Sequence, residues 1–255
     1  MKRFVAVVVV LVVGLCSLAA AQNRTYTIED LLKVRRVGDP QVSPDGKHVA
    51  FTVGDVNFNA NKVVTQIYVM SIEGGGMKQL TNGDTSSTAP RWSPDGKKIA
   101  YTNGFQVWVM DNDGDNKDQI TKISTDAAAP VWSPDGKWIA FTSDVYPDCN
   151  NDECNKKRNE QAESNKVKAH VVTRLLYKQW DEWRDVTRTH VFVVSSKGGT
   201  ARELTTGDFD SPPYAASSGV NYAFSPDSSE IAYLRNPDKV EAISTNSDIF
   251  VMPLA

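Results

Sequence analysis

The hydrophobic positions of this chain alternate with polar ones in short runs, which is the period of a β-strand rather than that of a helix. In WSPDGKKIAYT, residues 92–102, Ile99 and Tyr101 fall on one face of the expected strand and Ala100 on the other. The stretch returns as WSPDGKWIAFT at 132–142 and in looser form at 42–52 and 224–234. The alternation therefore predicts four copies of one turn followed by one strand.

The Ser-Pro-Asp-Gly motif explains the turn in physical terms. Pro fixes φ at the second position, Asp suits the third and Gly accepts a left-handed fourth, so the motif predicts a type I turn with a following bulge. Ser228 replaces Gly in the fourth copy, which should cost on the order of 1 kcal/mol. An alanine recurs in every copy, as expected where another backbone packs closely: Ala50, Ala100, Ala140 and Ala232. The turn is thus a structural device.

The rest of each unit repeats as well. A second β-rich run follows each turn: QIYVMSIEGG from Gln66, QVWVMDNDGD from Gln106, HVFVVSSKGG from His190 and DIFVMPLA from Asp248. After the first three runs comes a short segment that ends in threonine: KQLT to Thr81, DQIT to Thr121 and RELT to Thr205. Four strands in a repeat of about 40 to 45 residues are the signature of a β-propeller blade.

The predicted fold is all-β, a partial β-propeller of about four four-stranded blades with a helical insertion. The expected blades are residues 40–85, 86–123, 124–206 and 207–255, and the last lacks its closing strand. The segment TIEDLLKVRRV, which could otherwise supply that strand, predicts a short helix with Thr27 as its cap and Asp30 in its first turn. The incomplete propeller would span 22–255.

The third unit contains an insertion at about 145–172. Its ECNKKRNEQAESNKVKAH portion has the composition of an exposed helix without an apolar face, and it leads into a strand-like stretch with a charged, Trp-bearing centre. Insertions in propellers usually lie on one rim, where ligands or a partner domain bind.

Residues 1–21 predict a secretory signal peptide. Lys2 and Arg3 form a positive start, residues 4–15 are apolar, and three alanines at 19–21 supply the cleavage pattern. The apolar run is short for a permanent span, and Leu15 before Cys16 is bulkier than lipoprotein processing usually requires. We therefore expect an exported protein, periplasmic or secreted, with no membrane attachment after cleavage.

Export changes the interpretation of the cysteines, because only Cys149 and Cys154 remain after cleavage. In an oxidising compartment their short separation favours a local disulfide. A metal site with Asp148, Asp152 and Glu153 is an alternative, although two thiols without a nearby histidine make a poor zinc set, and two free thiols are another. No cofactor is expected. The net charge of −3 and the absence of a basic stripe argue against binding to nucleic acid.

Several features of the sequence resemble one known family. They are the signal peptide, the segment TIEDLLKVRRVGDPQVSPDGKHVAFTV, the WSPDGK turns, and YKQWDEWRDVTRTHVFVV with the following GGTARELTTGDFDSPP. They are similar to exported dipeptidyl-peptidase-5-like and acylaminoacyl-peptidase-like members of the prolyl oligopeptidase family, over residues 24–255. The resemblance implies an N-terminal propeller, commonly of seven or eight blades, that covers a C-terminal α/β-hydrolase domain. Such a propeller admits short peptides and excludes folded proteins.

The catalytic half of that family is not found in this sequence. No Gly-x-Ser-x-Gly nucleophile elbow occurs, and none of the histidines can be assigned as the triad base. His48 and His190 fall in predicted strands, and His170 follows the insertion. We therefore expect no catalytic residue and no peptidase activity in this chain alone; peptide substrates would be cleaved by the missing domain.

The resemblance also implies that propeller carboxylates could hold the α-amine of a substrate. The candidates are Glu160 and Glu163 on the insertion and Asp181 and Glu182 between two tryptophans, although a solvated charged face explains the same residues. An alternative function is a stand-alone periplasmic propeller of the TolB-like kind, which binds partner proteins and catalyses nothing.

Overall fold

The computed structural model describes residues 25–173, 175, 177–179, 182, 183, 186–213 and 220–254, without the side chains of residues 179 and 182. The chain divides into two compact units, one ending at Val34 and one beginning at Arg35. The predicted signal peptide, residues 1–21, lies outside the described residues.

The first unit contributes one short helix, α2 (Ile28–Leu32). The Thr27 hydroxyl accepts a hydrogen bond from the Asp30 backbone N–H at 3.3 Å, and the Asp30 carboxylate accepts one from the Thr27 N–H at 3.1 Å. This reciprocal capping box starts the helix. The prediction of a short helix capped by Thr27 is confirmed.

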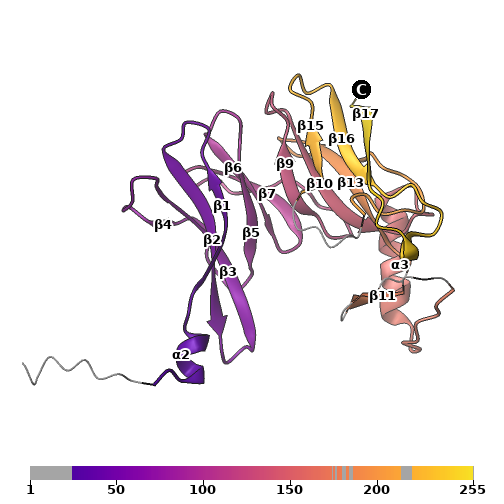
Figure 1. Cartoon of the computed structure of the whole chain (residues 1–255), viewed down its shortest axis with the longest axis horizontal. Coiled ribbons are helices and arrows are strands. Elements are labelled where there is room, and N and C mark those ends of the chain that lie inside the picture. Colours follow the sequence, from indigo (N-terminus) through magenta and orange to yellow (C-terminus); the bar gives the residue numbers. More distant parts are fainter. Residues whose placement is uncertain are drawn as a thin grey trace, which may run out of the picture. The chain divides into compact units, whose positions relative to one another are not determined.

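The second unit consists of antiparallel sheets that follow one another along the chain (Figure 1). The first sheet is β1 (Arg36–Val42), β2 (His48–Asn57), β3 (Lys62–Ser71) and β4 (Lys78–Gln79). The second is β5 (Ser87–Trp92), β6 (Lys98–Asn103), β7 (Gln106–Asp111) and β8 (Asp118–Gln119). The third is β9 (Ala128–Trp132), β10 (Trp138–Val145), β13 (Arg188–Ser195) and β14 (Arg202–Glu203). The fourth is β15 (Tyr222–Phe224), β16 (Glu230–Arg235) and β17 (Asp248–Pro253), with the 3-10 turn η1 (Glu241–Ile243) before β17.

These sheets confirm the predicted fold class, a partial β-propeller with a helical insertion. The helix α3 (Asp152–Ser164) and the two-stranded hairpin β11 (Lys178–Gln179) and β12 (Glu182–Trp183) lie between β10 and β13. Three sheets have four strands, and the fourth has three among the described residues.

The Ser-Pro-Asp turns share one hydrogen-bond pattern in all four copies. In the third copy the Ser133 hydroxyl donates to the Asp135 carboxylate at 2.6 Å and accepts from the Trp138 N–H at 2.9 Å, and the same carboxylate accepts from the Lys137 N–H at 3.0 Å. Equivalent serine–aspartate bonds occur at Ser43, Ser93 and Ser225. Serine and aspartate are therefore required together, since each satisfies the other and the backbone.

The fourth turn adopts the left-handed conformation without glycine. Gly96 and Gly136 both have a φ of 70°, and Ser228 at the equivalent position has a φ of 63°. The Ser228 hydroxyl accepts a hydrogen bond from the backbone N–H of Asp135 at 3.0 Å, which joins the third and fourth turns. The strain expected at this position is accompanied by a contact that glycine could not make.

Neighbouring sheets pack face to face through the recurring alanines. Ala50 packs in one cluster with Ile99 and Tyr101 of the second sheet, and Ala100 packs with Ile139 and Phe141 of the third. Ala140 and Ile231 repeat the contact between the third and fourth sheets. The small side chain lets the next sheet approach, so the two faces of each strand serve two different interfaces, as the alternation predicted.

The tryptophans before the second and third turns link one sheet to the next. The Trp92 indole N–H donates to the Gln41 carbonyl at 2.9 Å, and the Trp132 indole N–H donates to the Arg91 carbonyl at 3.1 Å. In the fourth sheet Phe224 occupies the position of these tryptophans, and its side chain has no N–H to donate. There the Tyr222 hydroxyl donates to the Ala129 carbonyl instead. Each link joins the first strands of adjacent sheets.

The first strands also contain a bulge that the sequence did not reveal. Asp39, Ala89 and Ala129 have φ values of 46°, 52° and 53°, and each precedes a proline. Non-glycine residues seldom adopt this conformation. Pairing with the second strand is interrupted at the same place in all three sheets. The Asp39 carboxylate binds the Arg91 guanidinium of the next sheet at 2.8 Å, so one bulge supports a further link.

Replacing the tryptophan tests the links between sheets. Trp132→Phe keeps most of the apolar contact but leaves the Arg91 carbonyl without its donor, so the free energy of unfolding should fall by about 1 kcal/mol. Urea unfolding followed by far-UV circular dichroism measures the change. The matched control is Trp138→Phe, at the partly exposed start of β10, and an equal loss in both variants would contradict the assigned role.

The turn aspartates make the fold sensitive to acid. Hydrogen bonds from the Ser133 hydroxyl, and then from the Lys137 N–H, lower the pKa of Asp135 to about 2. The pKa of Asp135 in the folded chain therefore lies below its value of about 4 in the unfolded chain. Ionisation of Asp135 stabilises the fold fully above about pH 4, and this stabilisation is lost as the pH falls to about 2.

Asp135→Asn removes this titration while keeping a side-chain oxygen in place. We expect the variant to be less stable than the original chain at pH 7 and the two to converge between pH 4 and about 2. Urea unfolding at a series of pH values measures both curves. Parallel curves over this window would show that the carboxylate charge contributes nothing to the turn.

Candidate functional site

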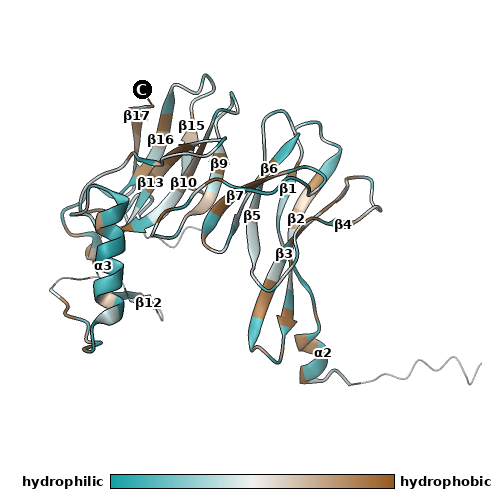
Figure 2. Cartoon of the chain, turned by 180° about the vertical axis from the view of Figure 1, so that it is seen from behind, coloured by the Kyte–Doolittle hydropathy of each residue, from teal (hydrophilic) through white to brown (hydrophobic). Residues whose placement is uncertain are grey.

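The insertion between β10 and β13 is the part of the third sheet that departs from the repeat. Its helix α3 (Asp152–Ser164) is hydrophilic around most of its circumference (Figure 2). Only Asn155 is buried among its residues. A helix of this composition is not held by an apolar stripe, so polar contacts must fix it to the sheet.

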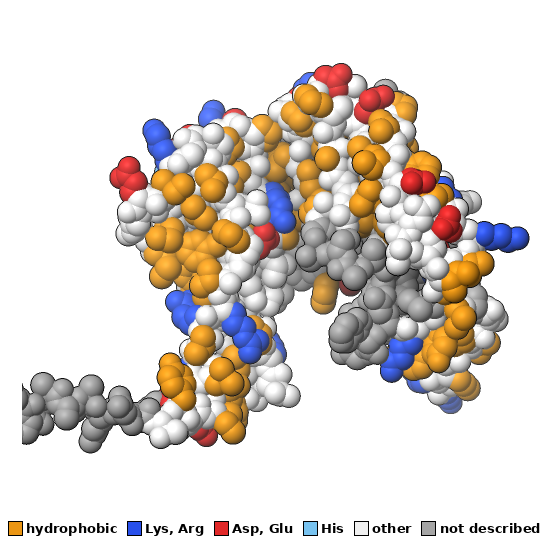
Figure 3. Space-filling model, in the orientation of Figure 1, with side chains coloured by type: hydrophobic (Ala, Val, Ile, Leu, Met, Phe, Trp, Pro, Cys, Tyr) orange, Lys and Arg blue, Asp and Glu red, His pale blue; other side chains and the backbone are white. Residues whose placement is uncertain are grey.

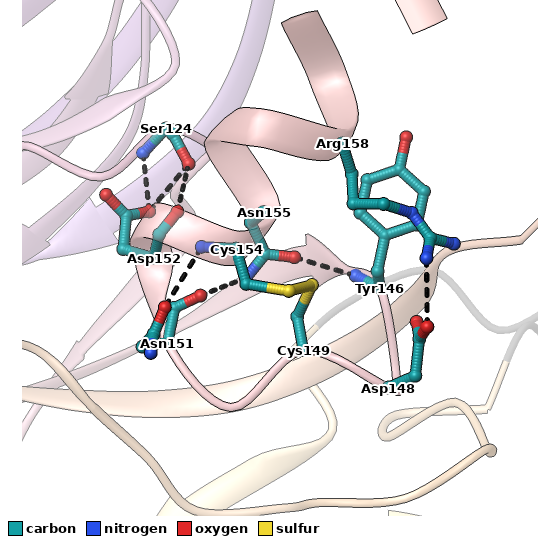
Figure 4. Close-up of a disulfide and its surroundings, with 9 residues drawn as sticks. All are labelled: Ser124, Tyr146, Asp148, Cys149, Asn151, Asp152, Cys154, Asn155 and Arg158. Atoms are coloured by element: carbon teal, nitrogen blue, oxygen red, sulfur yellow. Dashed lines mark hydrogen bonds and ion pairs between the residues drawn. A yellow bond between two sulfur atoms is a disulfide. The ribbon is translucent and has the colours of Figure 1, made fainter. Parts of the chain in front are cut away.

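Two asparagines anchor the start of α3 (Figure 4). The Asn151 carboxamide accepts a hydrogen bond from the Cys154 N–H at 2.9 Å and thereby caps the helix. The buried Asn155 side chain accepts from the Tyr146 N–H at 2.9 Å and donates to the Asn151 carbonyl at 3.3 Å. Because a buried amide is costly without partners, these bonds define one position of the helix relative to β10.

A second set of bonds joins α3 to the loop before β9. The Asp152 carboxylate accepts from both the N–H and the hydroxyl of Ser124, at 2.8 and 2.7 Å. About two turns later the Asn159 amide donates to the Ser124 carbonyl at 3.2 Å. The helix is therefore attached at two separate places along its axis.

Arg158 and a disulfide complete the attachment. The Arg158 guanidinium pairs with the Asp148 carboxylate at 2.9 Å and lies over the Tyr146 ring, 4.5 Å from its centroid. Cys149 and Cys154 are joined by a disulfide that bridges the loop and the first turn of α3. Of the alternatives that the sequence left open, the structure contains the disulfide. No group of three or more possible metal-binding side chains occurs in the described part of the chain.

Two of the four predicted amine-binding carboxylates lie on this fixed helix. Glu160 and Glu163 are both exposed on α3 and point toward solvent rather than into the sheet. Asp181 lies outside the described residues, and the side chain of Glu182 in β12 is not described. The helix thus presents two exposed carboxylates in its C-terminal half, just beyond the residues that attach it to the sheet.

A further carboxylate pair near the base of the insertion was not identified from the sequence. The pKa of Asp126 is raised, because neighbouring atoms reduce its hydration and because the charge of Asp144 lies close by. Asp144 accepts a hydrogen bond from the Thr189 hydroxyl at 2.6 Å. The two residues are distant in sequence and carry no motif, so only the spatial arrangement reveals the pair. Perturbed carboxyls of this kind mark candidate functional positions.

Aromatic side chains gather around Trp183 in the later part of the insertion. The His170 ring stacks on Trp183 with centroids 4.0 Å apart, and the Lys178 ammonium lies 5.1 Å from the centroid of the same ring. Trp183 remains about half exposed. His170, which lies outside the repeated units, therefore stacks on an aromatic ring at the surface.

His190 has a structural role that the repeat explains. Gln66 and Gln106 each donate from one amide nitrogen to two carbonyls of the following loop, for example to Gly83 at 3.0 Å and Thr85 at 3.1 Å. His190 occupies the same position in the third sheet, and its Nε2 contacts the carbonyls of Gly207 at 2.9 Å and Phe209 at 3.2 Å. Its Nδ1 contacts the Glu203 carboxylate. His190 therefore joins β14 through Nδ1 and the following loop through Nε2. The other histidine placed in a predicted strand, His48, begins β2.

The face of the molecule seen in Figure 3 does not concentrate one charge. Figure 3 shows lysine and arginine side chains scattered among acidic ones, with hydrophobic side chains gathered over β1 to β3. In the described residues no helix is long and apolar enough to cross a membrane. The part of the described chain that departs most from the repeat is the insertion, whose helix carries exposed carboxylates.

The sequence matches the family model described as the TolB beta propeller domain over residues 39–222. It is 33% identical over 244 residues to dipeptidyl-peptidase 5 of Porphyromonas endodontalis, an alignment that covers 92% of this chain and 34% of that protein. The dipeptidyl-peptidase 5 of Porphyromonas gingivalis is 28% identical over 247 residues, with 89% and 34% covered. The chain therefore spans about a third of the length of these relatives.

Solved structures support the fold. The acylaminoacyl peptidase of Pyrococcus horikoshii superposes with a TM-score of 0.62 at 18% identity, covering 87% of this chain and 31% of the peptidase. A second acylaminoacyl peptidase structure, in complex with Z-Gly-Gly-Phe-chloromethyl ketone, has the same TM-score at 17% identity. At these identities the likeness concerns the architecture alone. The stacked sheets, the repeated turns and the family match together show that the chain belongs to the TolB β-propeller domain family, and its similarity to the dipeptidyl-peptidase 5 proteins is to their propeller portion.

Proposed function

We propose that this chain is the propeller part of an exported serine peptidase that hydrolyses short peptides. The propeller would limit access to a catalytic α/β-hydrolase domain that is not contained in these 255 residues. Cleavage would be of the dipeptidyl- or acylaminoacyl-peptidase type, through a serine acyl-enzyme supplied by that domain.

The observation that carries this proposal is the extent of the similarity to dipeptidyl-peptidase 5. It runs over 92% of this chain, so it includes the insertion and is not confined to the turns that propellers share. It covers only 34% of the relative, which leaves room for a separate catalytic domain. The open side of the fourth sheet, where Ile249 and Val251 are exposed, is compatible with further sheets.

The test compares this chain alone with the polypeptide encoded by the whole reading frame of its gene. We expect the longer product to hydrolyse dipeptidyl chromogenic substrates or acylated amino-acid substrates and to be inhibited by a serine-directed fluorophosphonate. The 255-residue chain should show no hydrolysis. A reading frame without a Gly-x-Ser-x-Gly segment, or activity in this chain alone, would contradict the proposal.

Within this function, we propose that the carboxylates of the insertion hold the free α-amine of the substrate. Glu160 and Glu163 are supported by the attachment of α3 to the sheet, and Asp126 by its raised pKa and its place just after Ser124, which binds the start of the helix. A carboxylate at a fixed distance from the nucleophile determines how many residues are released, because it orients the charged amine. Asp181 and Glu182 remain further candidates.

Single neutralising substitutions in the longer enzyme separate these candidates. Glu160→Gln, Glu163→Gln or Asp126→Asn should lower kcat/KM for peptides with a free amine by about 10- to 100-fold if that residue binds the amine. N-acylated substrates should be unaffected. Glu153→Gln, in the first turn of the same helix, is the matched control. An equal effect on both substrate types would indicate a structural defect instead.

A stand-alone propeller of the TolB-like kind is the second candidate function. The family match favours it, because it is to the TolB propeller domain and extends over residues 39–222. In this function the exposed surfaces would bind partner proteins, and no hydrolase would be encoded with the chain. Co-purification of a stoichiometric partner, with no peptidase activity in the whole gene product, would support it over the peptidase.

Export is part of both candidate functions. The proposal rests on the signal-like segment at residues 1–21, with its basic start and its alanine cleavage pattern. Expressed from its own start codon in a bacterium, the protein should be recovered outside the cytoplasm with a new N-terminus after Ala21. Recovery of the unprocessed chain in the cytoplasm would overturn export.

A further inference from the structure

Two positions that are glutamine in the first two sheets are titratable in the third. In the second sheet Gln106 of β7 donates to two carbonyls of the following loop, and Gln119 lies on the neighbouring strand β8. The same positions of the first sheet are occupied by Gln66 and Gln79. In the third sheet they are His190 on β13 and Glu203 on β14. A neutral pair has thus been replaced, at both positions together, by a pair that can exchange a proton.

The side chain of His190 faces hydrogen-bond acceptors at both ring nitrogens. Its Nε2 lies 2.9 Å from the Gly207 carbonyl and 3.2 Å from the Phe209 carbonyl, and its Nδ1 contacts the Glu203 carboxylate. Carbonyl and carboxylate oxygens only accept, so each nitrogen needs a proton to bond with its partner. A neutral imidazole has a single N–H. Because His190 is completely buried, a nitrogen without its bond would be costly.

Glutamine at this position satisfies its surroundings without an added proton. The Gln106 carboxamide has two N–H groups for the loop and an oxygen, which accepts a hydrogen bond from the Thr121 hydroxyl at 2.7 Å. All of these bonds are independent of pH, because none of the groups titrates. The third sheet therefore holds its loop by a contact that differs from that of its neighbours in its need for a proton.

Glu203 is the charged group that contacts the His190 ring in the described part of the chain. The other charged side chains on the strands and the loop around it have partners of their own, apart from Asp126, which is exposed before β9. These partners are Arg188 for Asp208, Thr189 for both Asp144 and Asp210, and the Phe209 ring for Arg235. The proton is therefore held chiefly by His190 and Glu203 themselves.

We propose that His190 and Glu203 form a proton-dependent clamp, in which a doubly protonated imidazole ring holds the loop of residues 206–211 to the third sheet. A neutral ring would have one N–H for the carboxylate and the two carbonyls. The bond to the carboxylate is the stronger one, so that N–H stays on Nδ1, and Nε2 then presents a lone pair to the loop carbonyls. Loss of the proton therefore releases the loop, which leads from the third sheet to the fourth.

The direction of the pH effect follows from the count of protons. In the unfolded chain a histidine titrates near pH 6.5 and a glutamate near pH 4.3, so at about pH 8 this pair binds almost no proton, whereas the folded clamp binds one. Folding therefore takes up a proton at this pH. The stability that the clamp contributes is complete at lower pH and is lost as the pH rises until the folded clamp gives up its proton.

The double variant with His190→Gln and Glu203→Gln rebuilds the pair of the second sheet and removes the titration. Urea unfolding followed by far-UV circular dichroism measures both chains between about pH 6 and pH 9. Relative to the double variant, the folding equilibrium constant of the original chain should fall by up to about tenfold per pH unit, the limit for one proton. Parallel curves for the two chains would overturn the clamp.

Release of the loop has an internal control in the second sheet. The Ser211 N–H donates to the Thr189 carbonyl at 2.7 Å beside the histidine clamp, and the Ala127 N–H donates to the Phe105 carbonyl at 2.8 Å beside Gln106. Hydrogen exchange of both amides is followed against pH, and their ratio removes the general rise in exchange with pH. Protection of Ser211 relative to Ala127 should fall by about tenfold or more as the clamp loses its proton. A constant ratio in the original chain would overturn release of the loop.

The protonation state can be observed in the original chain, so the proposal does not depend on a variant that folds. A long-range proton–nitrogen NMR spectrum reports which imidazole nitrogens carry a proton. His48 and His170 are exposed and serve as controls. His190 should retain both N–H groups at a pH at which these two rings are neutral. A neutral His190 ring at that pH would overturn the proposal.

Discussion

The structure depends on one contact, the packing of an alanine face of one sheet against the isoleucine face of the next. Ala100 and Ile99 are adjacent in β6 and point to opposite sides, so a single strand takes part in two interfaces. The small side chain permits a close approach, and the larger one fills the space left by the alanine of the preceding sheet. Ile99, Ile139 and Ile231 each precede an alanine, and Val49 holds this position in the first sheet, so every interface buries the same kind of pair.

The remaining repeated residues serve this stacking. The serine and aspartate of each turn satisfy one another and the backbone, which sets the start of the strand that carries the alanine. Trp92 and Trp132 then connect the first strands of successive sheets. Where the repeat changes, a different residue provides an equivalent contact: His190 replaces glutamine in the loop clamp, and Tyr222 provides the link that Phe224 cannot. The substitutions preserve the hydrogen bond rather than the residue type.

The insertion follows a different principle, since it has little apolar surface to bury. Its helix is held by a cap, a buried asparagine, a serine–aspartate contact, an arginine that pairs and stacks, and a disulfide. Polar contacts of this kind specify position more than they add stability, because each replaces bonds to water. A helix attached at several points is suited to hold a charged group at a set distance from a substrate, as the proposed function requires.

The sequence by itself determined the strand pattern, the turns, the short capped helix and the family resemblance, because period-two alternation and Ser-Pro-Asp-Gly are local signals. Only the tertiary structure decided the left-handed bulges at Asp39 and Ala89, the raised pKa of Asp126, and the bond from Trp132 to the Arg91 carbonyl. These features join residues that are distant along the chain, or strain a backbone that neighbouring sheets hold in place. Local chemistry therefore specified the repeating unit, and contacts between units specified where its side chains meet.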